Sequence, residues 1–319
     1  MIVTTKENQT TISKKISLSG VGLHTGKDVS ITFCPADSDH GYVFKRIDIE
    51  GNPLIEADAN FVTSTERGTC LNKNSITIQT CEHVLASLVG LEIDNVLIEL
   101  NASEPPIMDG SSKYFVEALE KAGIKQLSQK RKEFIVRNVI SYKDEASGSE
   151  ITIIPASQYS VTTMVDFGTK ILGTQNATIE NISEFKDNIS SCRTFSFLHE
   201  IEMLLSKGLI KGGDLNNAIV YVDKPLSEET MSKLKKAFNK DKISVKSNGI
   251  LDNLTLHYPN EAARHKLLDV IGDLALIGTR VRGKVIATKP GHYINTKFSK
   301  KMKDIIKDSK KNDIPQIDF

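Results

Sequence analysis

The stretch EAARHKLLDVIGDLAL (Glu261–Leu276) is the segment on which the interpretation of this chain depends. At the ~100° per residue of an α-helix, its leucine, isoleucine and valine side chains share one broad apolar face. On the opposite side, His265, Asp269 and Asp273 form a polar stripe. The pattern predicts a helix that packs through its apolar face, and the polar stripe needs a separate explanation.

Two interpretations of the polar stripe stay open from these residues alone. The first is a solvated face of an ordinary amphipathic helix. The second is a binding site, since His265 and Asp269 lie one turn apart and can ligate one metal ion from the same side, with Asp273 behind them. Asp269 and Asp273 are like charges at i,i+4, which costs the helix roughly a few tenths of a kcal/mol unless a cation lies nearby. Leu276 also interrupts the stripe, which argues against a face fully open to water.

A second segment of the chain resembles this helix. EHVLASLVG (Glu82–Gly90) aligns with RHKLLDVIG (Arg264–Gly272), and the alignment pairs His83 with His265 and the final glycine of each segment. Self-similarity of this kind predicts two halves of related build, each with a His-bearing helix. Nine aligned positions are a weak repeat, so chance similarity between two amphipathic helices remains the alternative.

The composition places the chain among ordinary globular proteins. With 319 residues, 39% hydrophobic and 25% charged, it is long enough for two domains with their own cores. A net charge of +1 gives no indication of nucleic-acid binding. The chain has no apolar run near the ~18 residues of a membrane span, and its N-terminus lacks the core of a signal peptide. Its four widely spaced cysteines include no C-x-x-C pair, so we expect them to be reduced thiols. We therefore expect a cytoplasmic protein that does not span a membrane.

The order of patterns along the chain suggests a division into two domains. Short alternating segments predict strands in both halves, and Thr80 is the expected N-cap of the first His-bearing helix. The charged run Gln129–Glu133 is predicted to be a linker. We therefore expect an N-terminal domain over 1–127 and a C-terminal domain over 134–297. The lysine-rich segment 298–319 is expected to be a partly frayed helix that becomes a tail or linker.

The two His-bearing helices together offer a set of metal ligands. A catalytic zinc needs three protein ligands and one open position for water, and His83, His265 and Asp269 supply such a set. Two neutral imidazoles and one carboxylate would leave the site at a charge of about +1, which helps to lower the pKa of the bound water. The residues alone leave a zinc hydrolase and a purely structural stripe as competing hypotheses.

Further polar residues complete a hydrolytic site. Glu82 precedes His83 and is a candidate general base for the water, a role that glutamate has in zinc proteases of different spacing. His292 lies in a glycine-flanked loop just after a predicted strand and is a candidate general acid, which Asp273 would orient or charge. The hydroxyl of Thr194, in CRTF (192–195), is a candidate to stabilise an oxyanion together with the metal.

Seven stretches, taken in order, resemble one enzyme family. The chain is similar to UDP-3-O-acyl-N-acetylglucosamine deacetylase, the zinc amidase of lipid A biosynthesis in Gram-negative bacteria. No single stretch decides this, whereas the ordered set is highly specific. The stretches are GVGLHTG (20–26), CEHVLASLVGLEIDNVLIEL (81–100), EPPIMDGSS (104–112), CRTFSF (192–197), GLIKGGDLNNAIV (208–220), RHKLLDVIGDLALIG (264–278) and PGHYINT (290–296).

The resemblance implies a fold, a reaction and a set of residues. The fold is α+β, with two similar α/β domains of helices layered on sheets, related by internal duplication, and the active site between them. The reaction is the zinc-dependent hydrolysis of the N-acetyl group of UDP-3-O-(3-hydroxyacyl)-N-acetylglucosamine, the committed step of lipid A biosynthesis. The metal-binding and catalytic residues are those named above. Four further residues match positions associated with substrate or UDP binding, and these are Phe195, Lys266, Asp166 and Phe167. Two inserts, within about 50–73 and 195–223, are expected to form a hydrophobic passage for the acyl chain.

Some alternatives remain beside this resemblance. A zinc amidase that acts on another N-acetylated sugar would share the metal ligands, and a metal-free binding protein would need only the cleft. Cys81 and Pro290 depart from the residues common at their positions, although neither change removes a catalytic group. The chain is most similar to the deacetylase half of Bacteroidetes proteins in which a 3-hydroxyacyl-carrier-protein dehydratase follows. KKNDIPQIDF (Lys310–Phe319) resembles the linker to such a domain, which leaves open whether a dehydratase follows Phe319 in the native gene.

Overall fold

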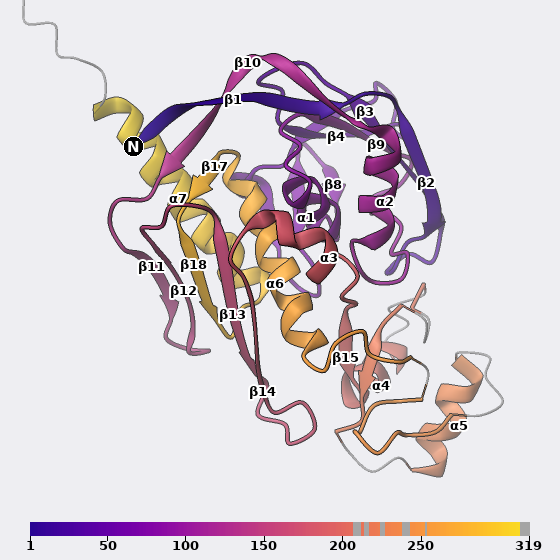
Figure 1. The fold of residues 1–319 in the computed structure, drawn as a ribbon. Coiled ribbons are helices and arrows are strands. Elements are labelled where there is room, and N and C mark those ends of the chain that lie inside the picture. The colour runs from indigo at the N-terminus through magenta and orange to yellow at the C-terminus, as the bar shows by residue number, and fades with distance from the viewer. Residues whose placement is uncertain (207–211, 214–216, 224–226, 238–242, 253, 313–319) are drawn as a thin grey trace, which may run out of the picture.

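A five-stranded sheet organises the first half of the chain in the computed structural model, which describes residues 1–206, 212–213, 217–223, 227–237, 243–252 and 254–312 (Figure 1). Its strands, in spatial order, are β2 (Ile16–Val21), β3 (Asp28–Pro35), β9 (Val96–Leu100), β4 (Tyr42–Arg46) and β5 (Leu54–Glu56). The pair β4 and β9 is parallel and the other pairs are antiparallel. Helices α1 (Glu82–Gly90) and α2 (Lys113–Ala122) share a hydrophobic core with this sheet.

A second five-stranded sheet has the same topology in the other half. Its spatial order is β11 (Ile140–Asp144), β12 (Ser149–Ile154), β18 (Lys284–Thr288), β13 (Ser160–Asp166) and β14 (Thr174–Ile179). Again the third and fourth strands, β18 and β13, are parallel, and the remaining pairs are antiparallel. Helices α6 (Glu261–Leu274) and α7 (His292–Asn312) pack on it through a common core.

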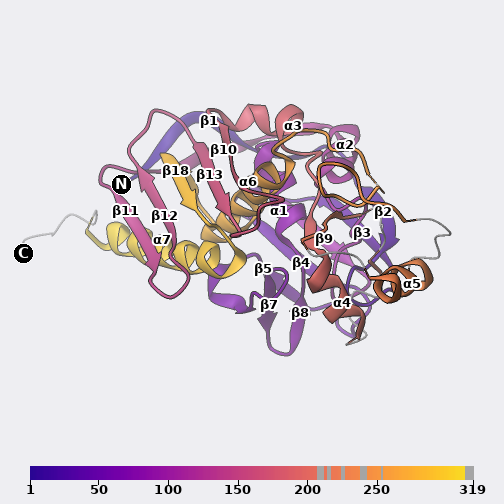
Figure 2. The ribbon, with the colours of Figure 1, turned by 90° about the horizontal axis from the view of Figure 1, so that it is seen from below.

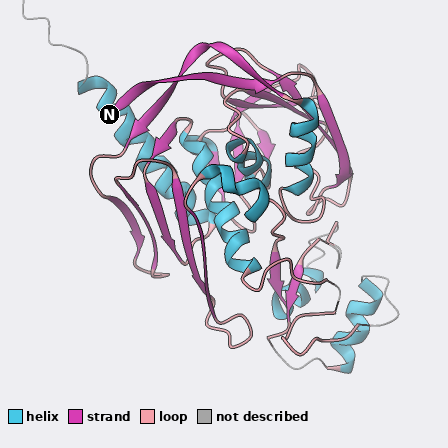
Figure 3. Cartoon of the chain, in the orientation of Figure 1, coloured by secondary structure: helices cyan, strands magenta, loops and turns pink. Residues whose placement is uncertain are grey.

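The two halves match element by element. In each half four strands precede the His-bearing helix, the third strand of the sheet follows that helix, and a further helix comes next. Thus α1 corresponds to α6, and α2 corresponds to α7. This shared order confirms the predicted α+β fold of two similar layered units related by duplication, with helices on one side of each sheet (Figure 3).

Each half carries an insertion before its His-bearing helix. In the first half the insertion is a three-stranded sheet of β6 (Val62–Ser64), β7 (Cys70–Lys73) and β8 (Ile76–Ile78). In the second half it includes α3 (Phe185–Asn188), β15 (Phe195–Phe197), α4 (Leu198–Ser206), β16 (Ile219–Tyr221) and α5 (Glu228–Ala237). Parts of both expected acyl-chain inserts belong to these elements, and residues 207–211 and 214–216 of the second lie outside the described residues. In Figure 2, β7 and β8 of the first insertion and α4 of the second lie at the lower edge of the view, whereas α3 lies at the upper edge.

The connection between the halves is a strand and not the predicted linker. The run Gln129–Glu133 lies inside β10 (Ile124–Ile135), which pairs with β1 (Ile2–Ile12) and with β17 (Arg280–Arg282). This three-stranded sheet spans from one half to the other over α1 and α6 (Figure 1). The charges in β10 are used within the fold, because Arg131 is buried and forms ion pairs with Glu7, Glu92 and Asp94.

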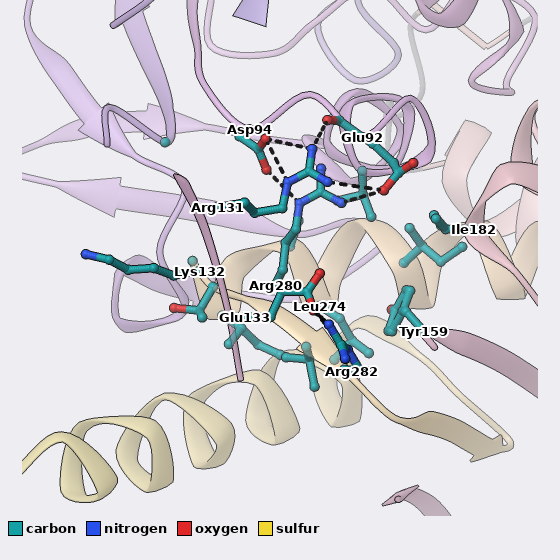
Figure 4. Close-up of a pocket in the computed structure, with 18 of the residues that line it drawn as sticks. Glu92, Asp94, Arg131, Lys132, Glu133, Tyr159, Ile182, Leu274, Arg280 and Arg282 are labelled. Carbon is teal, nitrogen blue, oxygen red and sulfur yellow. Dashed lines mark hydrogen bonds and ion pairs between the residues drawn. The ribbon is translucent and has the colours of Figure 1, made fainter. Parts of the chain in front are cut away.

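An ion-pair network beside β10 joins the two halves (Figure 4). Arg280, on β17 of the second half, pairs with Glu92 and Asp94 of the first, at 3.1 and 2.6 Å. Arg131 pairs with the same Asp94 at 2.9 Å. The network borders a cavity of about 940 Å³ whose lining includes none of the predicted site residues. The ion pairs therefore contribute to the position of one half against the other, away from the predicted site.

The lysine-rich end of the chain packs as a helix up to Asn312. Phe298, Met302 and Ile306 of α7 are buried against the second half, at the i, i+4 spacing of one helix face. The expected helix is therefore present in residues 298–312, but at Phe298, Met302 and Ile306 it is packed in the core and not frayed. Residues 313–319 lie outside the described part of the chain. Among the described residues, no helix has the length and apolar character needed to cross a membrane.

Candidate metal and catalytic site

The two His-bearing helices meet at a glycine. A Cβ atom on Gly272 would lie 2.1 Å from the backbone oxygen of Glu82, so only glycine allows α6 to approach the first turn of α1 this closely. Gly90, the aligned glycine of α1, plays a similar part against the ring of Phe185. The close approach at Gly272 brings Glu82 and His83 of the first half next to the polar stripe of α6.

The polar stripe is buried between the halves. His265, Asp269 and Asp273 are each no more than 1% exposed, which excludes the solvated-face interpretation. His83 Nε2 lies 3.7 Å and His265 Nε2 lies 3.4 Å from the same oxygen, Asp269 Oδ1. That oxygen is buried and has no hydrogen-bond partner among the described residues. One ligand atom from each of the three residues falls within 4.8 Å of the others, which is the arrangement of a cluster that can hold a metal ion.

Neighbouring groups orient the three residues and set their charges. His265 Nδ1 must donate to the backbone oxygen of Cys192, 3.0 Å away, so His265 Nε2 is left with a free lone pair. Burial, followed by the neighbouring His265, lowers the pKa of His83 to about 3, and burial also lowers the pKa of His265. Burial alone would raise the pKa of Asp269, but the Lys266 ammonium and nearby groups lower it below its usual range. Two neutral imidazoles and one carboxylate are the protonation states in which these side chains bind a metal.

Lys266 supplies the cation that the paired aspartates of α6 require. Its Nζ donates to Asp269 Oδ2 at 2.8 Å, so the other oxygen of Asp269 alone faces the two histidines. Burial would lower the pKa of Lys266, but Asp269 raises it. Lys266 therefore keeps its positive charge in the site.

A carboxylate and an imidazole border the metal cluster on one side. Glu82 is buried, and its Oε1 lies 3.8 Å from His292 Nε2. His292 Nδ1 bonds Asp273 Oδ2 at 2.9 Å, as expected for an oriented imidazole. Burial raises the pKa of Glu82 to about 7, although His292 opposes this. Burial alone would lower the pKa of His292, whereas the carboxylates of Asp273 and Glu82 raise it to about 9. These values suit an acceptor and a donor of protons near neutral pH.

A cavity of about 410 Å³ opens onto this cluster. Thr194 lines it and is held by two backbone bonds of 2.8 Å, from its own N–H to Gly110 and from the N–H of Ile219 to its carbonyl. Most of the predicted site residues line the same cavity, namely Glu82, His83, Phe167, Thr194, Phe195, His265, Lys266, Asp269 and His292. Asp273 lies behind His292, which agrees with an orienting role.

Aromatic rings form the wall beside the metal cluster. The ring of Phe195 lies 6.5 Å from that of His265 and 5.4 Å from that of Phe167, and the Lys266 ammonium lies over it at 5.6 Å. Asp166 is different, because it lies at the end of β13, pairs with Lys289 at 3.5 Å and does not line the cavity. The structure therefore brings three of the four predicted substrate residues to the cavity.

One prediction near the site is wrong, and two residues that contact Asp273 had not been predicted. Thr80 does not cap α1, because Cys81 holds the N-cap position and no side chain caps the helix. Thr80 instead has a left-handed backbone, with φ of 52°, and its buried hydroxyl has no partner among the described residues. No sequence pattern predicted a role for Thr69 or Asn295, whose side chains both donate to Asp273, at 2.5 and 2.9 Å.

Comparison with known proteins identifies the family to which this site belongs. The family model described as UDP-3-O-acyl N-acetylglycosamine deacetylase matches residues 9–243 and 230–304, which include every predicted site residue. The chain belongs to this deacetylase family. The resemblance seen in the ordered motifs is thereby confirmed.

Individual relatives of the family fall into two groups. The UDP-3-O-acyl-N-acetylglucosamine deacetylase of Geotalea uraniireducens is 37% identical over 291 residues, which cover 91% of this chain and 86% of the relative. The bifunctional enzyme LpxC/FabZ of Bacteroides thetaiotaomicron is 46% identical over 299 residues and covers 94% of this chain. The enzyme of the same name from Porphyromonas gingivalis is 43% identical over 301 residues, again with 94% of this chain covered. The match spans only 65% of the length of each bifunctional relative.

Proposed function

We propose that this chain is a zinc-dependent hydrolase that removes the N-acetyl group of UDP-3-O-(3-hydroxyacyl)-N-acetylglucosamine and releases acetate. One observation carries the proposal, namely the buried cluster of His83, His265 and Asp269 beside the pair of Glu82 and His292. Family membership and the names of the relatives support the substrate.

The residues present fit a zinc ion. His83, His265 and Asp269 would hold it, because these ligand types are those of catalytic zinc sites, and Asp269 Oδ1 is a buried acceptor without a partner among the described residues. When bound, zinc supplies Lewis acidity that polarises the amide carbonyl and increases the acidity of a water molecule. The protein contributes orientation, since Cys192 holds the ring of His265 and Lys266 holds the carboxylate of Asp269.

Glu82 and His292 move the protons of the reaction. Glu82 accepts a proton from the attacking water as the water oxygen bonds to the amide carbon. The hydroxyl of Thr194, on the cavity wall, donates a hydrogen bond to the oxygen that becomes negative in the tetrahedral intermediate. His292 then gives its Nε2 proton to the departing nitrogen as the carbon–nitrogen bond breaks, and Asp273 holds the imidazole through Nδ1. The products are acetate and the free amine.

The cavity wall supports an acylated nucleotide sugar as the substrate. Phe195 and Phe167 offer apolar and stacking surface, and the Lys266 ammonium between Phe195 and Asp269 offers a positive charge for an anionic ligand. Asp166 is retained as a proposed substrate residue at the rim, next to Lys289. A zinc amidase for another N-acetylated sugar would use the same metal ligands and is the alternative.

Three further proposals concern the whole protein. The chain works in the cytoplasm, where a nucleotide-sugar substrate would be found. The duplicated topology supports two domains that divide near 127–134, with β10 as their connection, and the packing of α7 extends the second domain beyond the expected end at 297. The bifunctional relatives support a native gene that continues into a dehydratase domain, and a reading frame beyond Phe319 tests this, because a stop codon there would exclude it.

The substrate is tested by acetate release. The wild-type protein loaded with zinc is compared on the acylated substrate and on UDP-N-acetylglucosamine without the acyl chain, with Glu82→Gln as the inactive control. We expect turnover that depends on the acyl chain and is lost in Glu82→Gln. Equal rates on both substrates would favour the other amidase, and no acetate from either would refute the proposed reaction.

A further inference from the structure

Thr69 links Glu82, the proposed general base, to Asp273, the partner of the proposed general acid His292. It is fully buried in the loop between β6 and β7, in the insertion of the first half. Its backbone N–H donates to Glu82 Oε2 at 3.1 Å. Its side-chain hydroxyl donates to Asp273 Oδ1 at 2.5 Å, a contact that crosses from the first half to α6 of the second. One residue therefore contacts the general base and the partner of the general acid.

The backbone bond determines which oxygen of Glu82 is free. Oε2 is occupied by Thr69, so Oε1 is the oxygen that faces His292, at 3.8 Å. The preceding residue, Gly68, has φ of 155°, and a Cβ atom there would lie 3.1 Å from the same Oε1. The positive φ of residue 68 favours glycine, and the absence of a side chain leaves room for the loop beside the carboxylate.

The hydroxyl bond determines the orientation of Asp273. Oδ2 of this carboxylate receives two bonds of 2.9 Å, from His292 Nδ1 and from Asn295 Nδ2. Oδ1 receives the hydroxyl of Thr69. With donors on both oxygens, the carboxylate cannot turn about its Cβ–Cγ bond without losing hydrogen bonds in a fully buried site. The plane of Asp273 in turn sets the position of the His292 ring.

These contacts form a closed ring of four residues. It runs from Glu82 through Thr69 to Asp273, on to His292, and back across the 3.8 Å gap to Glu82. Glu82 belongs to the first half and His292 to the second, so their separation depends on how the halves meet. We propose that Thr69 is a positioning residue that sets the separation of base and acid by binding both sides at once. This inference rests on the proposed function.

Two substitutions at position 69 separate the hydroxyl from the rest of the residue. Thr69→Val keeps the shape and the N–H bond to Glu82 but removes the donor to Asp273, whereas Thr69→Ser keeps both donors. We expect Thr69→Val to lower kcat by about 10–100-fold, with KM within about twofold, because a shift of about 1 Å in catalytic groups has an effect of this order. Thr69→Ser should recover most of the lost rate.

A matched control distinguishes positioning from general packing. Thr163 is another fully buried threonine, and its hydroxyl donates to the backbone oxygen of Ala263 at 3.0 Å and not to Glu82, Asp273 or His292. Thr163→Val should lower the melting temperature about as much as Thr69→Val does, while kcat stays near wild type. Equal losses of kcat in both variants would assign Thr69 a structural role only.

A double-mutant cycle tests whether Thr69 acts through the general acid. On a His292→Ala background, Thr69→Val should cause no further loss of kcat, because the group that it positions is absent. Additive losses would overturn the inference. Wild-type rates in His292→Ala would refute the proposed mechanism itself. A slow His292→Ala with a fast Thr69→Val would refute only the role of Thr69.

Discussion

The contact between α6 and α1 at Gly272 provides a sharp test of how the fold creates the site. In Gly272→Ala, the new Cβ atom would meet the backbone oxygen of Glu82 at 2.1 Å, and this separation must grow by at least 0.9 Å to reach 3.0 Å. A backbone oxygen in a helix cannot turn aside as a flexible side chain would. The two helices must therefore move apart, and they carry His83 and His265 with them.

The size of the effect follows from this displacement. A shift of about 1 Å between catalytic groups costs on the order of 10²-fold in rate, so kcat/KM should fall by about that factor. Helix propensity alone would favour alanine by about 1 kcal/mol, whereas overpacking costs about 1–3 kcal/mol, so we expect a net loss of stability. Acetate release measures kcat/KM and urea unfolding measures the stability, while the zinc content shows whether the displaced ligands still bind the metal.

Gly90→Ala is the matched control for this variant. Gly90 is the aligned glycine of α1, and its Cβ atom would also meet an atom at 2.1 Å, but that atom belongs to the ring of Phe185. The clash lies at the opposite end of α1 from Glu82, so stability should fall with little change in kcat. If Gly272→Ala kept its zinc and a kcat/KM within about threefold of wild type, the argument about helix approach would be wrong.

Further predictions concern the proton-transfer groups and the network that joins the halves. Glu82→Gln and His292→Ala should each lower kcat by about 10²–10⁴-fold while zinc stays bound, and a rate near wild type with bound zinc would contradict the assigned role. Asp273 raises the pKa of His292, and the protonated form of His292 is lost as the pH rises. Asp273→Asn should therefore lower this pKa and move the alkaline limb of the pH profile of kcat to lower pH. An unchanged alkaline limb would show that Asp273 does not act on this proton. Asp94→Ala removes one carboxylate partner from the buried Arg131, which keeps Glu7 and Glu92, and should cost about 1.5–3 kcal/mol in urea unfolding, with kcat unchanged in the folded protein. A loss below about 1 kcal/mol would mean that the network contributes little to stability.

The parts of the structure that the sequence predicted are those with a local pattern. The 3.6-residue period of Glu261–Leu276 identified α6, and its similarity to Glu82–Gly90 identified the duplication that both sheets confirm. The like charges of Asp269 and Asp273 indicated a nearby cation, which is Lys266. These signals exist because helix faces and i,i+4 contacts are properties of consecutive residues.

The parts that the sequence missed depend on contacts between distant residues. Gln129–Glu133 is a strand because β1, more than a hundred residues earlier, pairs with it and Asp94 neutralises Arg131. Thr69 gave no signal because its bond to Asp273 joins positions 204 residues apart. α7 is an exception, because its apolar residues Phe298, Met302 and Ile306 have the local i, i+4 spacing of a helix face, and the many lysines around them led to the wrong expectation of fraying.

Thr80 failed as an N-cap for a different reason. A cap requires an extended backbone just before the helix, whereas Thr80 has a left-handed one and Cys81 takes the N-cap position. A residue in such a strained conformation near Glu82, the proposed general base, is held there by its surroundings, which local sequence rules do not describe.

If His83, His265 and Asp269 hold a catalytic zinc ion, activity must follow the metal content of the protein. Metal content and acetate release are measured on the purified protein before chelation, after chelation, and after zinc is added back. We expect about one zinc per chain, activity that disappears with the chelator, and recovery with zinc. Full activity in protein that has been stripped of metal would contradict the claim.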